Sequence, residues 1–133
     1  MSAQQASHFL HRVLILDAAA SGATAVLLIA AAPALAPLLG LPVALMRGAG
    51  LVLLPYVAFV ALVARRGRFE AAAVWSIIVS NALWAAASVL LLLSGLIAPT
   101  ALGIAFVVGQ AVIVALLGEL QYVGLRRPAA AAI

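Results

Sequence analysis

Polar side chains capable of chemistry are few in this chain, and most of them lie inside long apolar stretches. Asp17, Ser21 and Thr24 follow one another at helical spacing, which places them on one face of a helix. Asn81 and Ser88 lie two turns apart on a second such face. Because lipid cannot satisfy these groups, we expect them to converge on the protein interior and form a substrate-binding site. The predicted site residues are Asp17, Ser21, Tyr56, Asn81, Trp84, Ser88 and Gln110.

The chemistry open to Asp17 depends on how its charge is compensated within an apolar segment. Three arrangements would make a buried Asp17 tolerable: protonation, an ion pair with an arginine such as Arg12 or Arg126, or contact with a water-filled pocket. Protonation or a pocket would suit proton coupling or solute binding, whereas an ion pair would be structural. The amides and hydroxyls have a similar alternative, because such groups also link membrane helices through hydrogen bonds.

The stretches that position these residues are long enough to cross a membrane. No charged residue occurs from Ala71 to Gly118, and 68% of the chain is hydrophobic against 8% charged. Spans of about 20 apolar residues match a hydrocarbon layer about 30 Å thick, and the lack of strict alternation argues against barrel strands. We therefore predict an all-α integral membrane protein, an antiparallel up-and-down bundle of four transmembrane helices. The expected spans are 12–38, 42–64, 70–95 and 99–123, in one domain, 1–127, followed by a flexible tail, 128–133.

The basic residues, all of them arginines, are distributed unevenly between the connections. Arg12 precedes the first span, and the other members of the larger set are Arg65, Arg66, Arg68, Arg126 and Arg127. Arg47 alone falls at the opposite side. By the positive-inside rule, this bias predicts a multi-pass protein of a cell inner membrane with both termini in the cytoplasm.

Several classes of site are not expected. Cysteine is absent, so disulfides, thiolate nucleophiles and zinc-thiolate sites are excluded. His8 and His11 precede the first span, and no histidine within the spans offers an axial haem ligand. We therefore expect no metal site and no cofactor. The formal charge of +4 reflects topology, so nucleic-acid binding is not expected either.

Rows of small residues indicate partners within the lipid bilayer. Ala101, Ala105 and Gly109 recur at intervals of four, a spacing that lets helix backbones approach closely. We expect a homo-oligomer, with a different membrane protein as the alternative partner. Alanine is abundant throughout the chain, so some of these rows also arise from composition alone.

Four segments carry a resemblance to known proteins. They are 16–22, 50–55, NALW at 81–84 with Ser88, and 109–127, which contains GQA, LQY and GLRR. Together they resemble a group of small four-span bacterial inner-membrane proteins with no assigned activity. The resemblance implies a bacterial cytoplasmic membrane and a four-span bundle, and it transfers no functional residue.

Two functions are compatible with these features. The first is an oligomeric transporter or channel for a small solute or ion, in which Asp17 binds or couples and the other polar residues shape the site. The second is a non-transporting accessory or scaffold subunit, in which the same polar groups hold helices together. An enzyme is not expected, because the spans lack histidine and paired carboxylates.

Overall fold

The computed structural model describes residues 2–131, with side chains through Arg127, and this part of the chain is helical without strands. Its helices are α1 (Ala3–Ala30), α2 (Ala32–Leu39), α3 (Val43–Arg66), α4 (Ala71–Leu93) and α5 (Ala101–Ala131). The expected tail, 128–133, lies outside the residues whose side chains are described, although the α5 backbone is assigned through Ala131.

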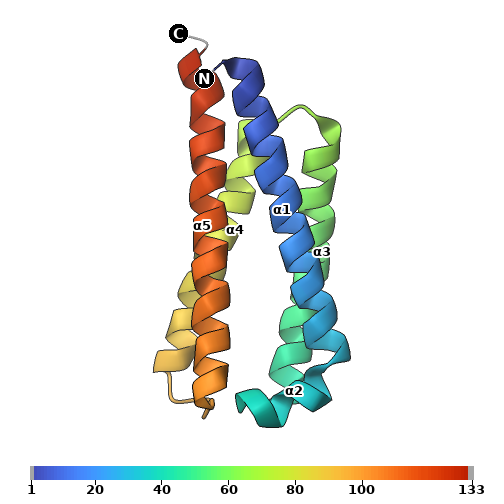
Figure 1. Ribbon diagram of the computed structural model, residues 1–133, viewed down its shortest axis with the longest axis vertical. Helices are drawn as coiled ribbons and strands as arrows, with labels where there is room; N and C mark the ends of the chain where they lie inside the picture. The colour runs from blue at the N-terminus through green and yellow to red at the C-terminus, as the bar shows by residue number, and fades with distance from the viewer. Residues whose placement is uncertain (1, 132–133) are drawn as a thin grey trace.

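Four of the helices, α1, α3, α4 and α5, are long and apolar enough to cross a membrane. The shortest of them, α4, has 23 residues, and a helix of that length extends about 35 Å at about 1.5 Å per residue. The four run up and down in an antiparallel bundle, as Figure 1 shows. The predicted fold class is therefore confirmed, and the chain is a small multi-pass helical membrane protein.

The segment 12–38, which we expected to form one helix, is broken at Ala31 into α1 and α2. Pro33 lies in the first turn of α2, where the absent proline N–H requires no partner. The same proline cannot donate to the carbonyl oxygen of Ile29, four residues earlier. The Nε of Arg47 instead donates to that oxygen at 3.4 Å. Arg47 thus has a structural role at the bend.

Thr100 joins the α4–α5 connection to the end of α2. Its hydroxyl donates to the carbonyl oxygen of Leu38 at 2.6 Å and accepts from the backbone N–H of Gly103 at 3.1 Å. Its own N–H donates to the carbonyl of Leu39 at 3.0 Å. One residue therefore satisfies carbonyls at the end of α2 and a donor at the start of α5.

The four long helices pack as two pairs. α1 packs along α3 and α4 packs along α5, and the pairs meet chiefly where α1 contacts α5. Gly50 permits the close approach of α3 to α1, because a Cβ there would lie 2.9 Å from the Ala25 carbonyl oxygen. α3 and α4 make few contacts with one another. The space between the two pairs is where polar residues gather.

Six arginines lie toward one end of the bundle, as the charge pattern indicated. The start of α1, the last turns of α5 and the α3–α4 turn share this end in Figure 1, while α2 lies at the opposite end. We call the end that holds both termini the terminal end and the opposite one the α2 end. α1 begins at Ala3, well before residue 12, because Ser2 and Gln5 form a capping box and Leu10 is buried against Gly124 of α5.

Candidate functional site

Asp17 is fully buried, with no exposed surface, and side chains from all four long helices donate hydrogen bonds to it. The hydroxyl of Ser21, one turn later in α1, donates to Oδ1 at 3.0 Å. Oδ2 accepts from the Tyr56 hydroxyl of α3 at 2.7 Å and from the Asn81 amide of α4 at 3.0 Å. It also accepts from the Gln121 amide of α5. We call these five residues the Asp17 network.

The Asp17 network compensates the buried carboxylate with neutral donors. An ionised carboxylate has about four lone-pair directions, and four side chains donate to this one. The structural ion pair considered for Asp17 is not what the structure shows. Arg126 instead donates to the Tyr122 hydroxyl at 3.1 Å and lies 5.4 Å from the centre of that ring. Arg12 lies near the protein surface beside Gln5, His8 and Phe9.

Further hydrogen bonds connect the donors to one another. The Asn81 amide donates to Gln121 Oε1 at 2.9 Å, and the Tyr56 hydroxyl lies 2.9 Å from Asn81 Oδ1. α5 packs closely on α4 at Gly118, where a Cβ would be in van der Waals contact with the Asn81 Cβ at 3.4 Å. At this close approach Gln121 of α5 reaches both Asn81 and Asp17.

A second hydrogen-bonded group lies nearer the α2 end. The indole N–H of Trp84 donates to Gln110 Oε1 at 2.9 Å, and the Gln110 amide donates to Ser88 Oγ at 2.9 Å and to the Val107 carbonyl at 2.8 Å. The Ser88 hydroxyl donates to the Trp84 carbonyl at 2.8 Å. We call Trp84, Ser88 and Gln110 the Trp84 group.

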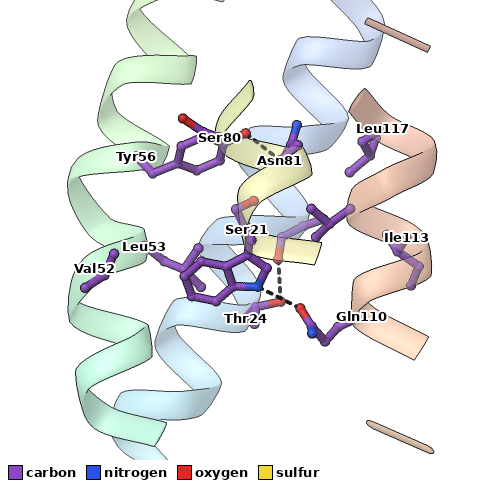
Figure 2. Close-up of a pocket in the computed structure, with 13 residues that line it drawn as sticks. Ser21, Thr24, Val52, Leu53, Tyr56, Ser80, Asn81, Gln110, Ile113 and Leu117 are labelled. Carbon is purple, nitrogen blue, oxygen red and sulfur yellow. Dashed lines mark hydrogen bonds between the residues drawn. The ribbon is translucent and has the colours of Figure 1, made fainter. Parts of the chain in front are cut away.

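A cavity of about 280 Å³ lies between the Asp17 network and the Trp84 group. Figure 2 shows Tyr56, Asn81 and Gln110, from three helices, around this space. The polar or aromatic lining residues are Ser21, Thr24, Tyr56, Ser80, Asn81, Trp84 and Gln110, and the apolar ones are Ala20, Val52, Leu53, Ile113, Val114 and Leu117. Asp17 itself is not among them, because its donors stand between the carboxylate and the cavity.

The cavity opens sideways rather than toward either end of the bundle. Val52 and Ile113 line it and are 62% and 54% exposed. Both residues lie near the middle of helices long enough to span a membrane. An opening at this depth lies at the level of the hydrocarbon layer that the four long helices would span.

A smaller cavity of about 90 Å³ continues toward the α2 end. It shares Thr24, Trp84 and Gln110 with the larger cavity, so these three side chains form the wall between the two. Its remaining lining is mainly apolar and includes Leu41, Met46 and Phe106. The larger cavity is therefore bounded by hydrogen-bonded side chains toward both ends.

All seven sequence-predicted site residues belong to these two groups. Asp17, Ser21, Tyr56 and Asn81 meet in one, and Trp84, Ser88 and Gln110 meet in the other. Their role in binding a substrate stays a prediction.

Gln121 is not among the predicted site residues, although it has no exposed surface and its amide donates to Asp17. An amide in an apolar helix was the available signal.

Metal-ligating residues do not gather in the part of the chain that the structure describes, where no group of three or more His, Asp or Glu could hold an ion. His11 is engaged elsewhere, with its Nδ1 3.1 Å from the Ala64 carbonyl oxygen. The arrangement is suited to reversible binding through hydrogen bonds and apolar contacts. No protein-family model, curated protein or solved structure matches the chain.

Proposed function

We propose that the protein is a small-solute carrier and that its binding site is the cavity between the Asp17 network and the Trp84 group. The observation that supports this proposal is a cavity at mid-membrane depth that combines an apolar lining with polar groups at both ends. Ligand sites are typically concave and mostly apolar, with a few convergent polar groups that orient the ligand.

The position of the hydrogen-bonded layers favours a carrier over an open channel. Asp17 and Gln121 lie one turn closer to the terminal end than the lining residues Ser21 and Leu117, and neither has exposed surface. This layer closes the cavity toward that end. Movement of the α1–α3 pair against the α4–α5 pair would break the Asp17 network, which joins the two pairs, and so open the cavity toward the terminal end. The Trp84 group has its hydrogen bonds within the α4–α5 pair and would stay intact during this movement, as a gated carrier requires.

The proposal extends to orientation and assembly. We place the terminal end in the cytoplasm and the protein in a bacterial inner membrane, because the arginine bias favours that direction of insertion. We further propose that the carrier is a homo-oligomer. Gly109 supports this, because it is exposed on α5 and nothing lies within 4 Å of a Cβ built there, so its close-packing surface is not used within the chain.

A second candidate is an accessory subunit that binds another membrane protein. The observation that favours it is the low burial of α4, in which only Val74, Ile77 and Asn81 of 23 residues are buried. Much of this helix is therefore available to lipid or to a partner. In this case the Asp17 network would act only as a link between helices.

Binding to the cavity can be followed by the fluorescence of Trp84. Trp75 lies outside the cavity, with its ring 5.5 Å from that of Tyr122, and Trp75→Phe leaves Trp84 as the remaining tryptophan. We expect saturable changes in Trp84 emission when purified protein is titrated with small aromatic probes, such as 2-phenylethanol, 2-phenylethylammonium or 3-phenylpropionate. Proteoliposomes should also exchange the bound probe faster than protein-free vesicles.

A matched pair of substitutions locates the binding. Ala20 lines the cavity, whereas its neighbour Ala19 is exposed and does not. Ala20→Phe should abolish binding and exchange because the ring fills the space, and Ala19→Phe should leave both unchanged. Absence of binding by every probe, or equal effects of the two variants, would contradict the carrier and favour the accessory subunit.

A further inference from the structure

We propose that the ligand of this cavity is a primary organic ammonium ion, whose head donates hydrogen bonds and carries positive charge and whose body is small and apolar. The inference rests on the proposed function, because it requires that the cavity binds a solute. It adds the chemical class of that solute, which follows from the hydrogen-bond donors and acceptors that line the cavity.

Every polar hydrogen on the cavity lining already has an acceptor within the protein. The Ser21 hydroxyl is directed to Asp17, and the Tyr56 hydroxyl has Asp17 and Asn81 in reach. The remaining hydroxyls, those of Thr24 and Ser80, donate to backbone carbonyls one turn earlier, at 2.8 Å and 2.7 Å.

The nitrogen donors of the lining are equally engaged. The two amide hydrogens of Asn81 have Asp17 and Gln121 as acceptors, at 3.0 Å and 2.9 Å. Those of Gln110 have Ser88 and Val107, and the indole N–H of Trp84 has Gln110. A ligand that needs to receive hydrogen bonds therefore finds no free donor on these side chains.

Acceptor capacity remains on the same side chains. A hydroxyl oxygen has two lone pairs in addition to its hydrogen. Thr24 and Ser80 use only their hydrogens in the bonds described, so both lone pairs of each oxygen are unused there. Ser21 likewise only donates in these bonds. A cavity with occupied donors and open acceptors selects a ligand that donates.

The charge around the cavity also favours an ammonium ion. The Asp17 carboxylate lies one hydrogen bond behind Ser21, Tyr56 and Asn81, all three of which line the space. The chain has no lysine, and no arginine lines the cavity. In an environment of low dielectric constant the field of the carboxylate is weakly screened, so a cation is favoured and an anion is repelled.

The apolar lining and aromatic rings suit the rest of such a ligand. Val52, Leu53 and Ile113 offer contacts to a hydrocarbon body. Trp84 and Tyr56 bring aromatic rings to the same space, and aromatic rings attract organic cations. The sideways opening allows an amphipathic cation to enter with its apolar body in the lipid.

Four probes with the same phenylethyl-type body and different heads test the inference on the Trp75→Phe protein in detergent at neutral pH. They are 2-phenylethylammonium, its N,N,N-trimethyl analogue, 2-phenylethanol and 3-phenylpropionate. We expect the primary ammonium to bind at least about tenfold more tightly than the alcohol and the carboxylate. The trimethyl analogue has the charge but no N–H donor, so it should bind more weakly than the primary ammonium.

Two sets of variants separate charge from hydrogen bonding. Asp17→Asn removes the charge and should reduce the preference for the ammonium over the alcohol to near unity. Ser80→Ala and Ser76→Ala both remove a hydroxyl that donates to a carbonyl one turn earlier, but only Ser80 lines the cavity. Ser80→Ala should weaken ammonium binding by about threefold, with Ser76→Ala unchanged, so the test does not depend on the folding of Asp17→Asn.

The outcomes distinguish this inference from the proposed function. If the alcohol, the carboxylate or the trimethyl analogue binds as tightly as the primary ammonium, the cavity is a binding site and the ligand class is wrong. Equal effects of Ser80→Ala and Ser76→Ala would likewise reject the hydrogen-bonding part. Binding by none of the four probes would contradict both the carrier and its ligand class.

Discussion

The carboxylate of Asp17 in the first long helix accepts a hydrogen bond from the amide of Gln121 in the last, 104 residues further along the chain. Both side chains are fully buried. The contact joins the α1–α3 pair to the α4–α5 pair where α1 packs on α5. Tyr56 and Asn81 complete the same network, so it exists only when all four long helices are assembled.

Replacing Asp17 should destabilise the protein. Asp17→Ala leaves four donors without their shared acceptor, and three of these hydrogen bonds come from other helices. At roughly 0.6 kcal/mol per hydrogen bond between membrane helices, the loss is about 2 kcal/mol. Asp17→Asn should cost less, because one side-chain oxygen still accepts. Equilibrium unfolding in mixed micelles measures both values.

Glu119→Gln provides the control for the loss of a carboxylate, since Glu119 is exposed. It should leave the unfolding free energy nearly unchanged. The structural account of the Asp17 network would be wrong if Asp17→Ala were as stable as Glu119→Gln. It would also be wrong if neutralising Arg12 or Arg126 restored the stability of the Asp17 variants, because that result would reveal an ion pair.

Two glycines in α3 should respond to alanine in opposite directions. At Gly50 a Cβ would lie 2.7 Å from Cγ1 of Ile29 and 2.9 Å from the Ala25 carbonyl oxygen, whereas Gly48 has nothing within 4 Å. Gly50→Ala should therefore separate α3 from α1 and cost about 1–3 kcal/mol. Gly48→Ala should be neutral or stabilising by up to about 1 kcal/mol, because alanine favours helix. Thermal unfolding of the two variants side by side tests the packing of α1 on α3.

The orientation can be tested by introduced cysteines, since the chain contains none. Ala3 is exposed at the terminal end, and Leu96 is 82% exposed in the connection at the α2 end. In intact bacterial cells Leu96→Cys should react with a membrane-impermeant maleimide, and Ala3→Cys should react only after permeabilisation. The reverse pattern would place the termini outside the cell.

Self-association should depend on the outer face of α5. Gly109→Leu adds bulk to an exposed position with no intramolecular neighbour, so it should weaken the oligomer without altering the fold of one chain. Gly48→Leu adds the same bulk to an equally open position on α3 and serves as the control. The mass of the protein in lipid discs measures the oligomeric state. A monomeric unsubstituted chain would contradict the proposed oligomer, and equal effects of the two variants would contradict this interface.

The sequence by itself determined the class of fold and which end of the bundle carries most of the arginines. A run without charge from Ala71 to Gly118 is compatible with membrane helices, and each such helix satisfies its own backbone, so the spans can be identified one at a time. The clustering of six arginines toward one end follows from the order of the spans. The bend at Ala31 was harder to predict from the sequence, because proline, here Pro33, is also tolerated within membrane helices.

Only the tertiary structure decided what the polar residues do. Helical spacing showed that Asp17 and Ser21 share a face, but not which side chains of α3, α4 and α5 would lie opposite that face. Those partners depend on the rotation and depth of each helix, which are set by contacts such as Gly118 against Asn81 and Gly50 against Ala25. For this reason the sequence left the compensation of Asp17 open, and the structure supplies four neutral donors rather than an arginine. The cavity between the helix pairs, with open acceptors and occupied donors, likewise exists only in the assembled bundle, because it is bounded by residues from four helices.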